Sequence, residues 1–223
     1  MSGGRDAILG KIRRSLGVSG DDLRRNATVD DRLTRAPKGV IPARGQLPQA
    51  ERIALFAAMA EKVSASVARL ADTDAIPMAV AEYLRAHNLP AAVRMGDDPL
   101  LVDLSWNRTP IEVKRGASDG TDAVGVSHAF AAVAESGTLV LTSGSDNPTT
   151  VNFLPETHIV VVKAEDVAGD YETVWDKIRA RYGKGTIPRT VNFVTGPSRS
   201  ADIEQTILLG AHGPRRLHII VLG

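Results

Sequence analysis

Hydrophobic side chains in the first half of the chain recur every three or four residues, the spacing that lines one face of a helix. This pattern predicts a short basic helix over residues 6–16, a long helix over residues 48–70 and a further helix over residues 75–87. The basic face of the first helix is either solvated, with the apolar face docked, or contacts a partner or a membrane surface. The long helix is expected to pack on a core.

The segment between the first two helices is polar. Residues 17–47 are rich in Arg and Asp and are interrupted by Pro37, Pro42 and Gly45, which favours an extended arm or linker. We therefore expect an N-terminal helix with an extended arm over residues 1–47, followed by an α/β domain over residues 48–223.

From residue 91 the pattern changes to short apolar runs, which are typical of strands. The predicted strands span residues 91–95, 111–114, 124–127, 138–143, 158–163, 190–195 and 217–222. The runs that begin at His158 and Leu217 are apolar without alternation, as strands are when both faces of a sheet are covered. Most of the sheet is therefore expected to be parallel.

Helical patterns at about residues 165–182 and 201–209 lie between the last strands. Strands that alternate with helices form right-handed βαβ units with helices on both faces of an open sheet. The expected fold class is therefore α/β, with a mainly parallel central sheet flanked by helices and with an N-terminal helical arm. In such sheets ligands bind at the carboxyl ends of the strands.

Composition narrows the classes of partner. The chain has 27 Lys and Arg against 26 Asp and Glu, so its formal charge of +1 gives no global field for nucleic acid or anionic membranes. It has no cysteine, which excludes disulfides, thiolate nucleophiles and Cys-ligated zinc or iron–sulfur clusters on this chain. No stretch resembles a signal sequence or approaches the roughly 18 apolar residues of a membrane span, so we expect a cytoplasmic protein.

The strongest candidate site follows the strand predicted at residues 190–195. Gly196 predicts a sharp exit from that strand, Ser200 is placed to cap the helix predicted over residues 201–209, and Asp202 would stabilise its first turn. A helix start directs unpaired backbone N–H groups at an anion. Capping and turn formation alone would explain the same residues.

Two further residues of this loop extend the anion-binding interpretation. The planar guanidinium of Arg199, beside the hydroxyl of Ser198 and the expected helix start, suits a carboxylate or a phosphate. The competing explanation is an ordinary surface arginine.

A second candidate is the turn before the strand predicted at residues 138–143. Glu135 fits a nucleophile, a general base or a ligand-binding carboxylate, and Gly137 allows the backbone to approach a ligand closely before Thr138 enters the strand. Nearby backbone N–H groups could equally satisfy such a carboxylate.

A third candidate is the polar stretch over residues 143–150, which ends near Asn152. It follows the carboxyl end of a predicted strand, where α/β proteins build their sites. Its Gly, Asn and Pro residues are also ordinary turn formers, so a site and a simple connection are equally good interpretations.

Of the five histidines, His212 precedes the last strand and is the best candidate for an active imidazole. His128 is placed near the start of a helix, upstream of Glu135. The other three are interpreted as structural or surface residues: His87, His158 and His218. No set of His, Asp and Glu has the spacing of metal ligands, so no intrinsic metal is expected.

Four motifs occur in order along the chain: Ala134-Glu-Ser-Gly-Thr-Leu-Val-Leu, Phe153-Leu-Pro-x-x-His158-Ile-Val-Val-Val, Gly196-Pro-Ser-Arg-Ser-Ala-Asp-Ile-Glu and Gly210-Ala-His-Gly-Pro. Together they closely resemble the LutC type of LUD-domain lactate-utilisation proteins. The resemblance spans about residues 120–223, and the helices predicted from residue 48 fit the same domain.

This resemblance implies a fold similar to the NagB/RpiA/CoA-transferase group. It also implies a role in the oxidation of L-lactate to pyruvate, alongside two partner proteins that bind iron–sulfur clusters. The absence of cysteine agrees with clusters carried by partner proteins, so no cofactor is expected on this chain.

Three functions compete. The first is an accessory or non-redox subunit of a lactate-oxidising assembly that binds a small carboxylate or phosphate-bearing ligand, with Glu135 and His212 as tentative catalytic residues. The expected ligand-binding residues are Gly137, Thr138, Gly196, Ser198, Arg199, Ser200 and Asp202. The alternative is an independent acyl-CoA, acyl-transfer or sugar-phosphate enzyme that uses Glu135, which rests on fold analogy. The third is a regulatory or scaffolding protein whose loops contact partners.

Overall fold

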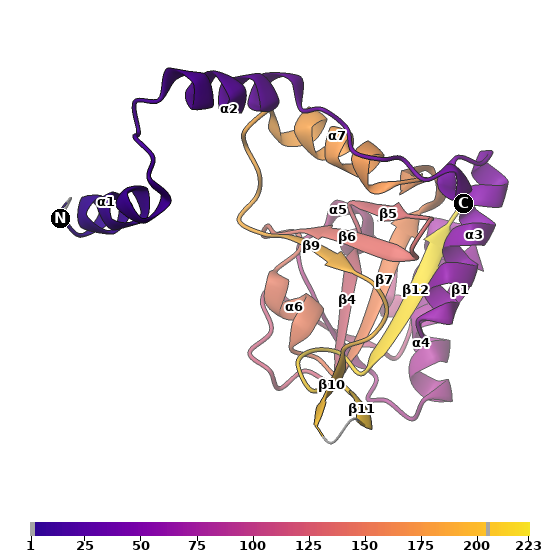
Figure 1. Ribbon diagram of the computed structural model, residues 1–223. Coiled ribbons are helices and arrows are strands. Elements are labelled where there is room, and N and C mark those ends of the chain that lie inside the picture. The colour runs from indigo at the N-terminus through magenta and orange to yellow at the C-terminus, as the bar shows by residue number, and fades with distance from the viewer. Residues whose placement is uncertain (1–2, 204–205) are drawn as a thin grey trace. The chain divides into compact units, whose positions relative to one another are not determined.

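The computed structural model describes residues 3–203 and 206–223. Two compact units, Met1–Gly39 and Val40–Gly223, make up the chain. The larger unit has the α/β fold that the sequence predicts, with a mainly parallel central sheet flanked by helices (Figure 1). No helix in the described part of the chain is both long and apolar enough to span a bilayer.

The N-terminal unit contains two helices, α1 (Gly3–Leu16) and α2 (Leu23–Arg35). Helix α1 confirms the first predicted helix, whereas α2 lies where an extended arm was expected. The Asp22 side chain accepts hydrogen bonds from two backbone N–H groups of the first turn of α2, and Ala36 ends the helix in a left-handed conformation. The many Arg and Asp residues hid α2, because its sequence holds only three large apolar side chains, Leu23, Val29 and Leu33.

The larger unit is built on a six-stranded sheet in which every strand pair is parallel. Its strands, in spatial order, are β1 (Ser66–Leu70), β12 (Arg216–Leu222), β7 (Thr157–Lys163), β4 (Val124–His128), β2 (Ala92–Met95) and β3 (Glu112–Arg115). The five strands other than β1 were predicted, with bounds that agree within two residues.

The central strands are covered on both faces, as their continuous apolar runs predict. In β7, Val160 and Val162 face one hydrophobic cluster, while Ile159 and Val161 face another. All four side chains are fully buried.

A second, four-stranded sheet packs on the first. Its strands, in spatial order, are β8 (Val167–Ala168), β5 (Ala131–Val133), β6 (Thr138–Thr142) and β9 (Val191–Val194). Strand β6 runs antiparallel to both of its neighbours, whereas β5 and β8 are parallel. The predicted strands at residues 138–143 and 190–195 therefore exist but belong to this mixed sheet.

The helices of this unit are α3 (Gln49–Lys62), α4 (Ile76–Ala86), α5 (Pro99–Val102), α6 (Thr149–Phe153) and α7 (Tyr171–Tyr182). This unit also has short 3-10 helices, labelled η1 (Ala43–Gly45), η2 (Thr73–Ala75), η3 (Trp106–Arg108) and η4 (Ala164–Asp166). Helix α4 covers one face of the parallel sheet, α3 and the mixed sheet cover the other, and α7 covers the outer face of the mixed sheet.

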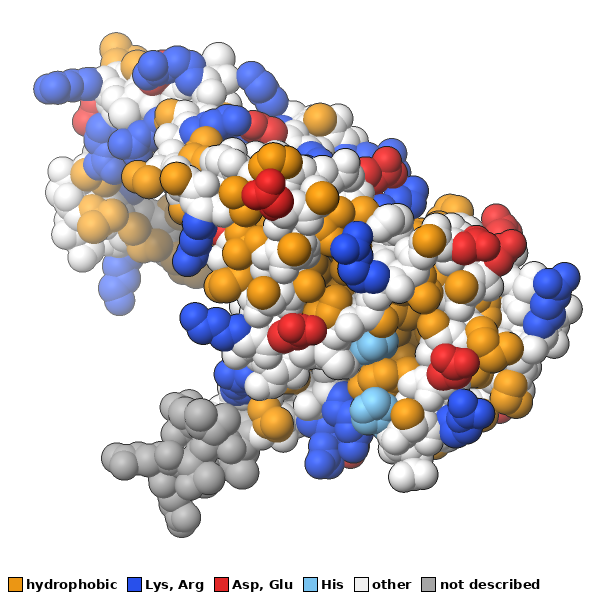
Figure 2. Space-filling model, turned by 90° about the vertical axis from the view of Figure 1, so that its right-hand side faces the viewer, with side chains coloured by type: hydrophobic (Ala, Val, Ile, Leu, Met, Phe, Trp, Pro, Cys, Tyr) orange, Lys and Arg blue, Asp and Glu red, His pale blue; other side chains and the backbone are white. Residues whose placement is uncertain are grey.

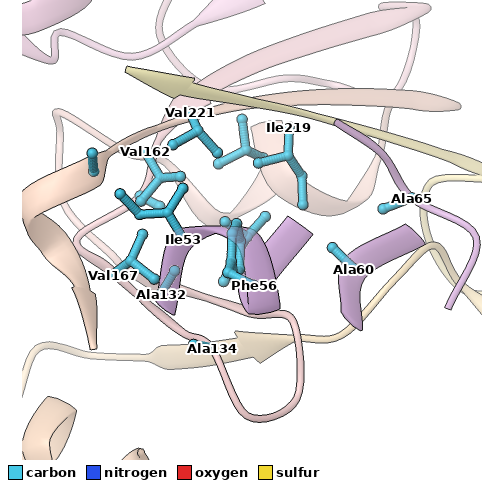
Figure 3. Close-up of a cluster of buried hydrophobic side chains, with 14 of the residues drawn as sticks. Ile53, Phe56, Ala60, Ala65, Ala132, Ala134, Val162, Val167, Ile219 and Val221 are labelled. Atoms are coloured by element: carbon cyan, nitrogen blue, oxygen red, sulfur yellow. The ribbon is translucent and has the colours of Figure 1, made fainter. Parts of the chain in front are cut away.

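Helix α3 supplies the centre of the largest core cluster. Figure 3 shows Ile53 and Phe56 of α3 beside Val162 of the parallel sheet and Val167 of the mixed sheet. Phe56 has no exposed surface. Because α3 is wedged between the two sheets in this way, the position of its last turn is fixed, and that turn supports the loops described below.

The long helix predicted over residues 48–70 is too long. Helix α3 ends at Lys62, Ser64 adopts a positive φ of 71°, and residues 66–70 form β1 beside β12. Serines and β-branched valines are weak helix formers, and pairing with a buried neighbouring strand gives this stretch backbone partners that a longer helix would have to supply internally.

The helix predicted over residues 201–209 is wrong. Strands β10 (Arg199–Ile203) and β11 (Thr206–Leu209) pair there as an antiparallel hairpin, and Glu204 and Gln205 lie outside the described residues. The stretch contains the β-branched residues Ile203, Thr206 and Ile207, which favour extended backbone. The acidic and polar residues that look like a helix start are part of the first strand instead.

The molecular surface carries charges of both signs. Figure 2 shows one face on which Lys and Arg side chains are interspersed with Asp and Glu and with hydrophobic side chains. With a formal net charge of +1, recognition of a charged ligand has to come from local groups.

Candidate functional site

A cavity of about 390 Å³ lies at the amino ends of two central strands. The second residues of β7 and β12, His158 and Leu217, pair in register and line it. Strand β9, helix α6 and the loops at residues 196–199 and 212–214 complete its wall. We call it the amino-end cavity.

A chain of three buried polar side chains supports the wall of this cavity. The hydroxyl of Ser127, on β4, donates to Asn152 Oδ1 at 2.7 Å and lies 2.8 Å from His158 Nε2. Because the Ser127 hydrogen is used by Asn152, His158 Nε2 has to carry the hydrogen of the second bond. The three groups therefore hold one another in a single orientation.

Burial lowers the pKa of His158 to about 3. The imidazole is therefore neutral at physiological pH, and only 1% of the residue is exposed. His158 acts on this cavity chiefly by orienting Ser127 and Asn152, which is compatible with the structural role that the sequence suggested.

The wall presents two hydrogen-bond donors that have no protein acceptor. Asn152 Nδ2 and Asn192 Nδ2 are buried and lack a hydrogen-bond partner among the residues that the structure describes. Both side chains line the cavity. We call these two groups the donor amides. An unmet buried donor costs about 1–3 kcal/mol, so a ligand that accepts hydrogen bonds, such as a carboxylate, is stabilised here.

Two of the sequence motifs meet at the rim. The backbone N–H of Ser198 donates to Pro214 O at 2.8 Å, and Gly210 N donates to Ser198 O at 2.9 Å. The His212 N–H donates to the Ser198 hydroxyl at 3.3 Å. Three of the residues expected to bind ligand line this cavity, Gly196, Ser198 and Arg199, and so does the tentative catalytic residue His212.

The end of helix α3 holds this loop in place. Arg199 Nη2 donates to Val63 O and, at 2.7 Å, to Ser64 Oγ. Gly196 has a φ of 76°, and a Cβ there would lie 2.4 Å from Val63 O, so only glycine fits. Part of the guanidinium therefore fixes the loop, and the exposed Arg199 also borders the cavity.

The capping roles expected for Ser200 and Asp202 are wrong, because both residues lie in β10 and no helix spans residues 201–209. Ser200 is buried, and the side chain of Asp202 lies outside the described part of the structure. The donors of the cavity are consequently side-chain amides and not the start of a helix.

The Glu135 motif is positioned elsewhere, and its residues are not among the described residues that line the amino-end cavity. A Cβ on Gly137, whose φ is 66°, would lie 2.3 Å from Ala60 N, so this glycine accommodates α3. The Thr138 hydroxyl contacts those of Ser136, Tyr171 and Thr195 at 2.7–2.9 Å. Through Thr195, the motif braces the strand end that leads into the Gly196 loop.

Glu135 itself is buried, with 5% of its surface exposed. Its Oε2 lies 3.8 Å from Arg44 Nε and accepts no hydrogen bond within the described residues. Glu135 and His212 therefore do not face one cavity, and no shared catalytic arrangement of the two is formed. Searching the described residues finds no group of three or more His, Asp or Glu side chains that could hold a metal ion.

Sequence reasoning missed most of the cavity wall. Asn192 lies in β9 and Ser127 lies in β4, and neither position carries a recognisable site pattern. Asn152 was noticed only as the end of a polar stretch. The available signal was an asparagine inside an otherwise apolar strand, because a buried amide needs partners.

The chain was compared with known proteins. A family model described as LUD domain matches residues 53–222. Lactate utilization protein C from Geobacillus sp. (strain WCH70) is 40% identical over 100 residues, which make up 44% of this chain and 42% of that protein. The protein of the same name from Bacillus subtilis (strain 168) is 38% identical over 100 residues, with the same 44% and 42% coverage.

Lactate utilization protein C from Anoxybacillus flavithermus (strain DSM 21510 / WK1) is 32% identical over 126 residues, 56% of this chain and 53% of that protein. The matches thus span about half or less of the length of these curated relatives.

A crystal structure of a DUF162 family protein from Deinococcus radiodurans superposes with a TM-score of 0.60 at 21% identity, covering 79% of this chain and 99% of that chain. At this identity the likeness shows the fold alone. The family match, in contrast, covers most of the chain and confirms the resemblance drawn from the four motifs. The chain therefore belongs to the LUD-domain family.

Proposed function

We propose that this protein is a non-redox component of a lactate-utilisation system and that it binds a small carboxylate in the amino-end cavity. The names of its relatives, lactate utilization protein C, support the pathway. The donor amides support the class of ligand, because they lie buried in a cavity wall with donors directed at no protein acceptor.

The two donor amides carry this proposal. A carboxylate has two oxygens and accepts several hydrogen bonds, so it matches Asn152 and Asn192 better than a neutral ligand with donors of its own. Arg199 and His212 at the rim add a cation and an imidazole near the same cavity. Because Ser127 and His158 hold Asn152 in place, binding does not have to order that side chain.

The redox chemistry belongs to partner proteins under this proposal. The chain contains no cysteine and therefore cannot supply the thiolates that usually hold iron–sulfur clusters. We place the protein in the cytoplasm with iron–sulfur subunits that carry the electrons from lactate. If the purified chain alone oxidised L-lactate and reduced an electron acceptor, this division of labour would be wrong.

The test combines a binding measurement with growth. Asn152→Asp keeps the size of the side chain and the acceptor for Ser127 but replaces a donor amide by a negative oxygen. We expect L-lactate and pyruvate to bind the variant at least about tenfold more weakly by calorimetry, the loss of roughly one charge-assisted hydrogen bond. Bacillus subtilis lacking its own lactate utilization protein C should grow on L-lactate with this chain but not with the variant.

Asn107→Asp is the matched control, because it replaces the same amide by a carboxylate at an exposed position of η3. It should bind and grow like the unmodified chain. Wild-type binding and growth of the Asn152→Asp protein would overturn the proposal, as would a failure of the unmodified chain both to bind these carboxylates and to restore growth.

One observation favours a second candidate, an enzyme that uses Glu135. Glu135 is a buried carboxylate with one oxygen that lacks a hydrogen bond in the described structure, a side chain of the type that serves as a nucleophile in covalent catalysis. Glu135→Gln separates the candidates, because it should abolish an activity that depends on this carboxylate yet leave carboxylate binding in the amino-end cavity intact. Unchanged growth on L-lactate with Glu135→Gln would count against a catalytic Glu135.

A further inference from the structure

A second cavity, of about 520 Å³, lies at the opposite edge of the parallel sheet. It is bordered by the last residues of β4 and β7, His128 and Lys163, and by Asp98, which follows β2 by three residues. We call it the carboxyl-end cavity. The carboxyl edge is where open parallel sheets most often bind ligands, and the proposed function does not involve this edge.

His128 is positioned by a buried carboxylate. The sequence placed His128 at a helix start, which is wrong, because it ends β4. Its Nδ1 lies 3.1 Å from Asp98 Oδ2, and Asp98, 8% exposed, also accepts from Leu100 N through Oδ1 at 2.9 Å. In the neutral form of the imidazole, the ring nitrogen that faces this carboxylate carries the hydrogen, which leaves the lone pair on Nε2.

Two acceptors in this cavity wall lack a donor. His128 Nε2 and Asn147 Oδ1 are both buried and receive no hydrogen bond from the described residues. Asn147 is 5% exposed, and its Nδ2 donates to Thr142 O at 3.2 Å, which fixes the amide with its oxygen free to accept. We call these two atoms the acceptor pair.

The loop that carries Asn147 is tied to the end of β2. Asp97 N donates to Ser145 O at 3.1 Å, and a Cβ on Gly96 would lie 2.1 Å from Asp146 O. The backbones are therefore in direct contact. This arrangement holds the acceptor pair on neighbouring parts of one wall before any ligand arrives.

The rest of the lining is mixed in character. The rings of Phe130 and Tyr182 border the cavity, with centroids 6.2 Å apart. Charged side chains of both signs complete it: Asp146, Asp166, Lys163 and Arg181. Asp166 already pairs with Lys177 at 3.0 Å. A lining of this kind, with apolar rings and polar groups of both signs, does not select for one net charge.

We propose that the carboxyl-end cavity is a second ligand site and that it takes a small polyhydroxy compound. Hydroxyl groups supply the donors that His128 Nε2 and Asn147 Oδ1 require, and the same hydroxyl oxygens accept from Lys163 and Arg181. The aromatic rings cover the C–H face of such a ligand. A carboxylate has no donor and leaves both members of the acceptor pair unsatisfied.

The test follows the ring nitrogens of His128 by nitrogen NMR on the full chain, above the pH at which the free imidazole charges. Glycerol, D-ribose, D-glucose and myo-inositol are the probes, and acetate, which lacks a donor at neutral pH, is the control solute. At least one polyol should shift the Nε2 signal saturably, and acetate should not.

Three variants make the assignment specific. His128→Phe removes one acceptor, and Asp98→Asn keeps the helix cap but removes the charge that orients the ring. Each should weaken polyol binding at least about tenfold, the loss of one hydrogen bond to a buried group. His87→Phe, at the residue that follows α4, is the control and should leave polyol binding unchanged.

Folding of each variant is checked by thermal unfolding, and Asp98→Asn keeps the test valid if His128→Phe does not fold. The proposal is overturned if none of the four polyols moves the His128 signal, if acetate moves it equally, or if Asp98→Asn binds like the unmodified chain. Its outcome is separate from that of the proposed function, because Asn152→Asp should leave polyol binding intact.

Discussion

The two edges of the parallel sheet carry cavities with opposite hydrogen-bonding character. At the amino edge, two amide nitrogens of Asn152 and Asn192 require acceptors. At the carboxyl edge, the oxygen of Asn147 and the ring nitrogen of His128 require donors. Buried polar groups are normally satisfied, and under the two proposals a ligand supplies the partner for each set. The difference teaches that the two edges of one sheet can present opposite hydrogen-bonding groups.

The two histidines of these edges lie on adjacent strands but have different environments. His158 is the second residue of β7, and its ring is enclosed by the core and hydrogen-bonds to the Ser127 hydroxyl, so burial keeps its pKa at about 3. His128 ends β4 and has a carboxylate partner. The same side chain therefore orients a neighbour at one edge and faces a ligand site at the other. Strand position and partner decide the role.

The largest effect expected of a single substitution breaks the amino-end cavity itself. Gly196→Ala places a Cβ 2.4 Å from Val63 O at a φ of 76°, so it should lower the free energy of unfolding by about 2–5 kcal/mol, combining backbone strain and overpacking. Urea denaturation measures this. Gly185→Ala, with a φ of 75° and open space around it, should lose only about 1–2 kcal/mol. Equal losses would show that the contact with α3 is unimportant.

A second prediction concerns pH. Burial lowers the pKa of His158 to about 3 and that of His218 to about 4, from 6.5. Above pH 6.5 the two rings are neutral in both the folded and the unfolded chain. Below pH 6.5 the unfolded chain takes up protons that the folded chain does not. The free energy of unfolding therefore falls as the pH is lowered toward 4 for His218 and toward 3 for His158.

Over this pH range the free energy of unfolding should change by about 1.4 kcal/mol per pH unit for each of the two histidines. Urea denaturation at several pH values measures it. His158→Gln should remove one of the two contributions and His218→Gln the other. A slope that neither buried variant alters would contradict the neutral, buried state of these rings.

A smaller effect distinguishes the asparagines of the two edges. Asn147→Leu loses the buried hydrogen bond that the Asn147 amide donates to Thr142 O, so it should cost about 1–3 kcal/mol. Asn192→Leu removes a donor amide whose nitrogen bonds to no described residue, so it should cost less than about 0.5 kcal/mol or stabilise the fold. The reverse ranking in thermal unfolding would mean that the amide of Asn192 is satisfied within the protein.

The smallest expected effect is the crossed binding experiment. Asn152→Asp should weaken carboxylate binding about tenfold without affecting polyols, and Asp98→Asn should do the opposite. Calorimetry with L-lactate and with the best polyol gives the four affinities. A variant that weakens both ligands equally would indicate that the two cavities are coupled or that only one site exists.

Much of the fold was predictable, because in most segments the local hydrophobic pattern agrees with the tertiary structure. The apolar runs of β7 and β12 predicted a sheet covered on both faces, and helices α4 and α7 lie within predicted helical stretches. The prediction failed at β1 and at the hairpin of β10 and β11. In both places the backbone partners come from another strand, which the periodicity of one short segment does not reveal.

The candidate site likewise has residues that the sequence identified and residues that it missed. The Gly196 loop and His212 were identified from turn residues and do line one cavity. Glu135 was identified by its type and lies away from it. Asn192 was missed, because an amide in a strand becomes a site only when the packing leaves its nitrogen without an acceptor.

The sequence by itself determined the α/β class, the family motifs and the impossibility of Cys-ligated clusters on this chain, because these depend on local pattern and composition. Only the tertiary structure decided which polar groups face a cavity and which are satisfied. Hydrogen-bond satisfaction is a property of pairs such as Ser127 with Asn152, or Asp98 with His128, which lie 25 and 30 residues apart in sequence. The chemistry available at each edge of the sheet therefore follows from packing.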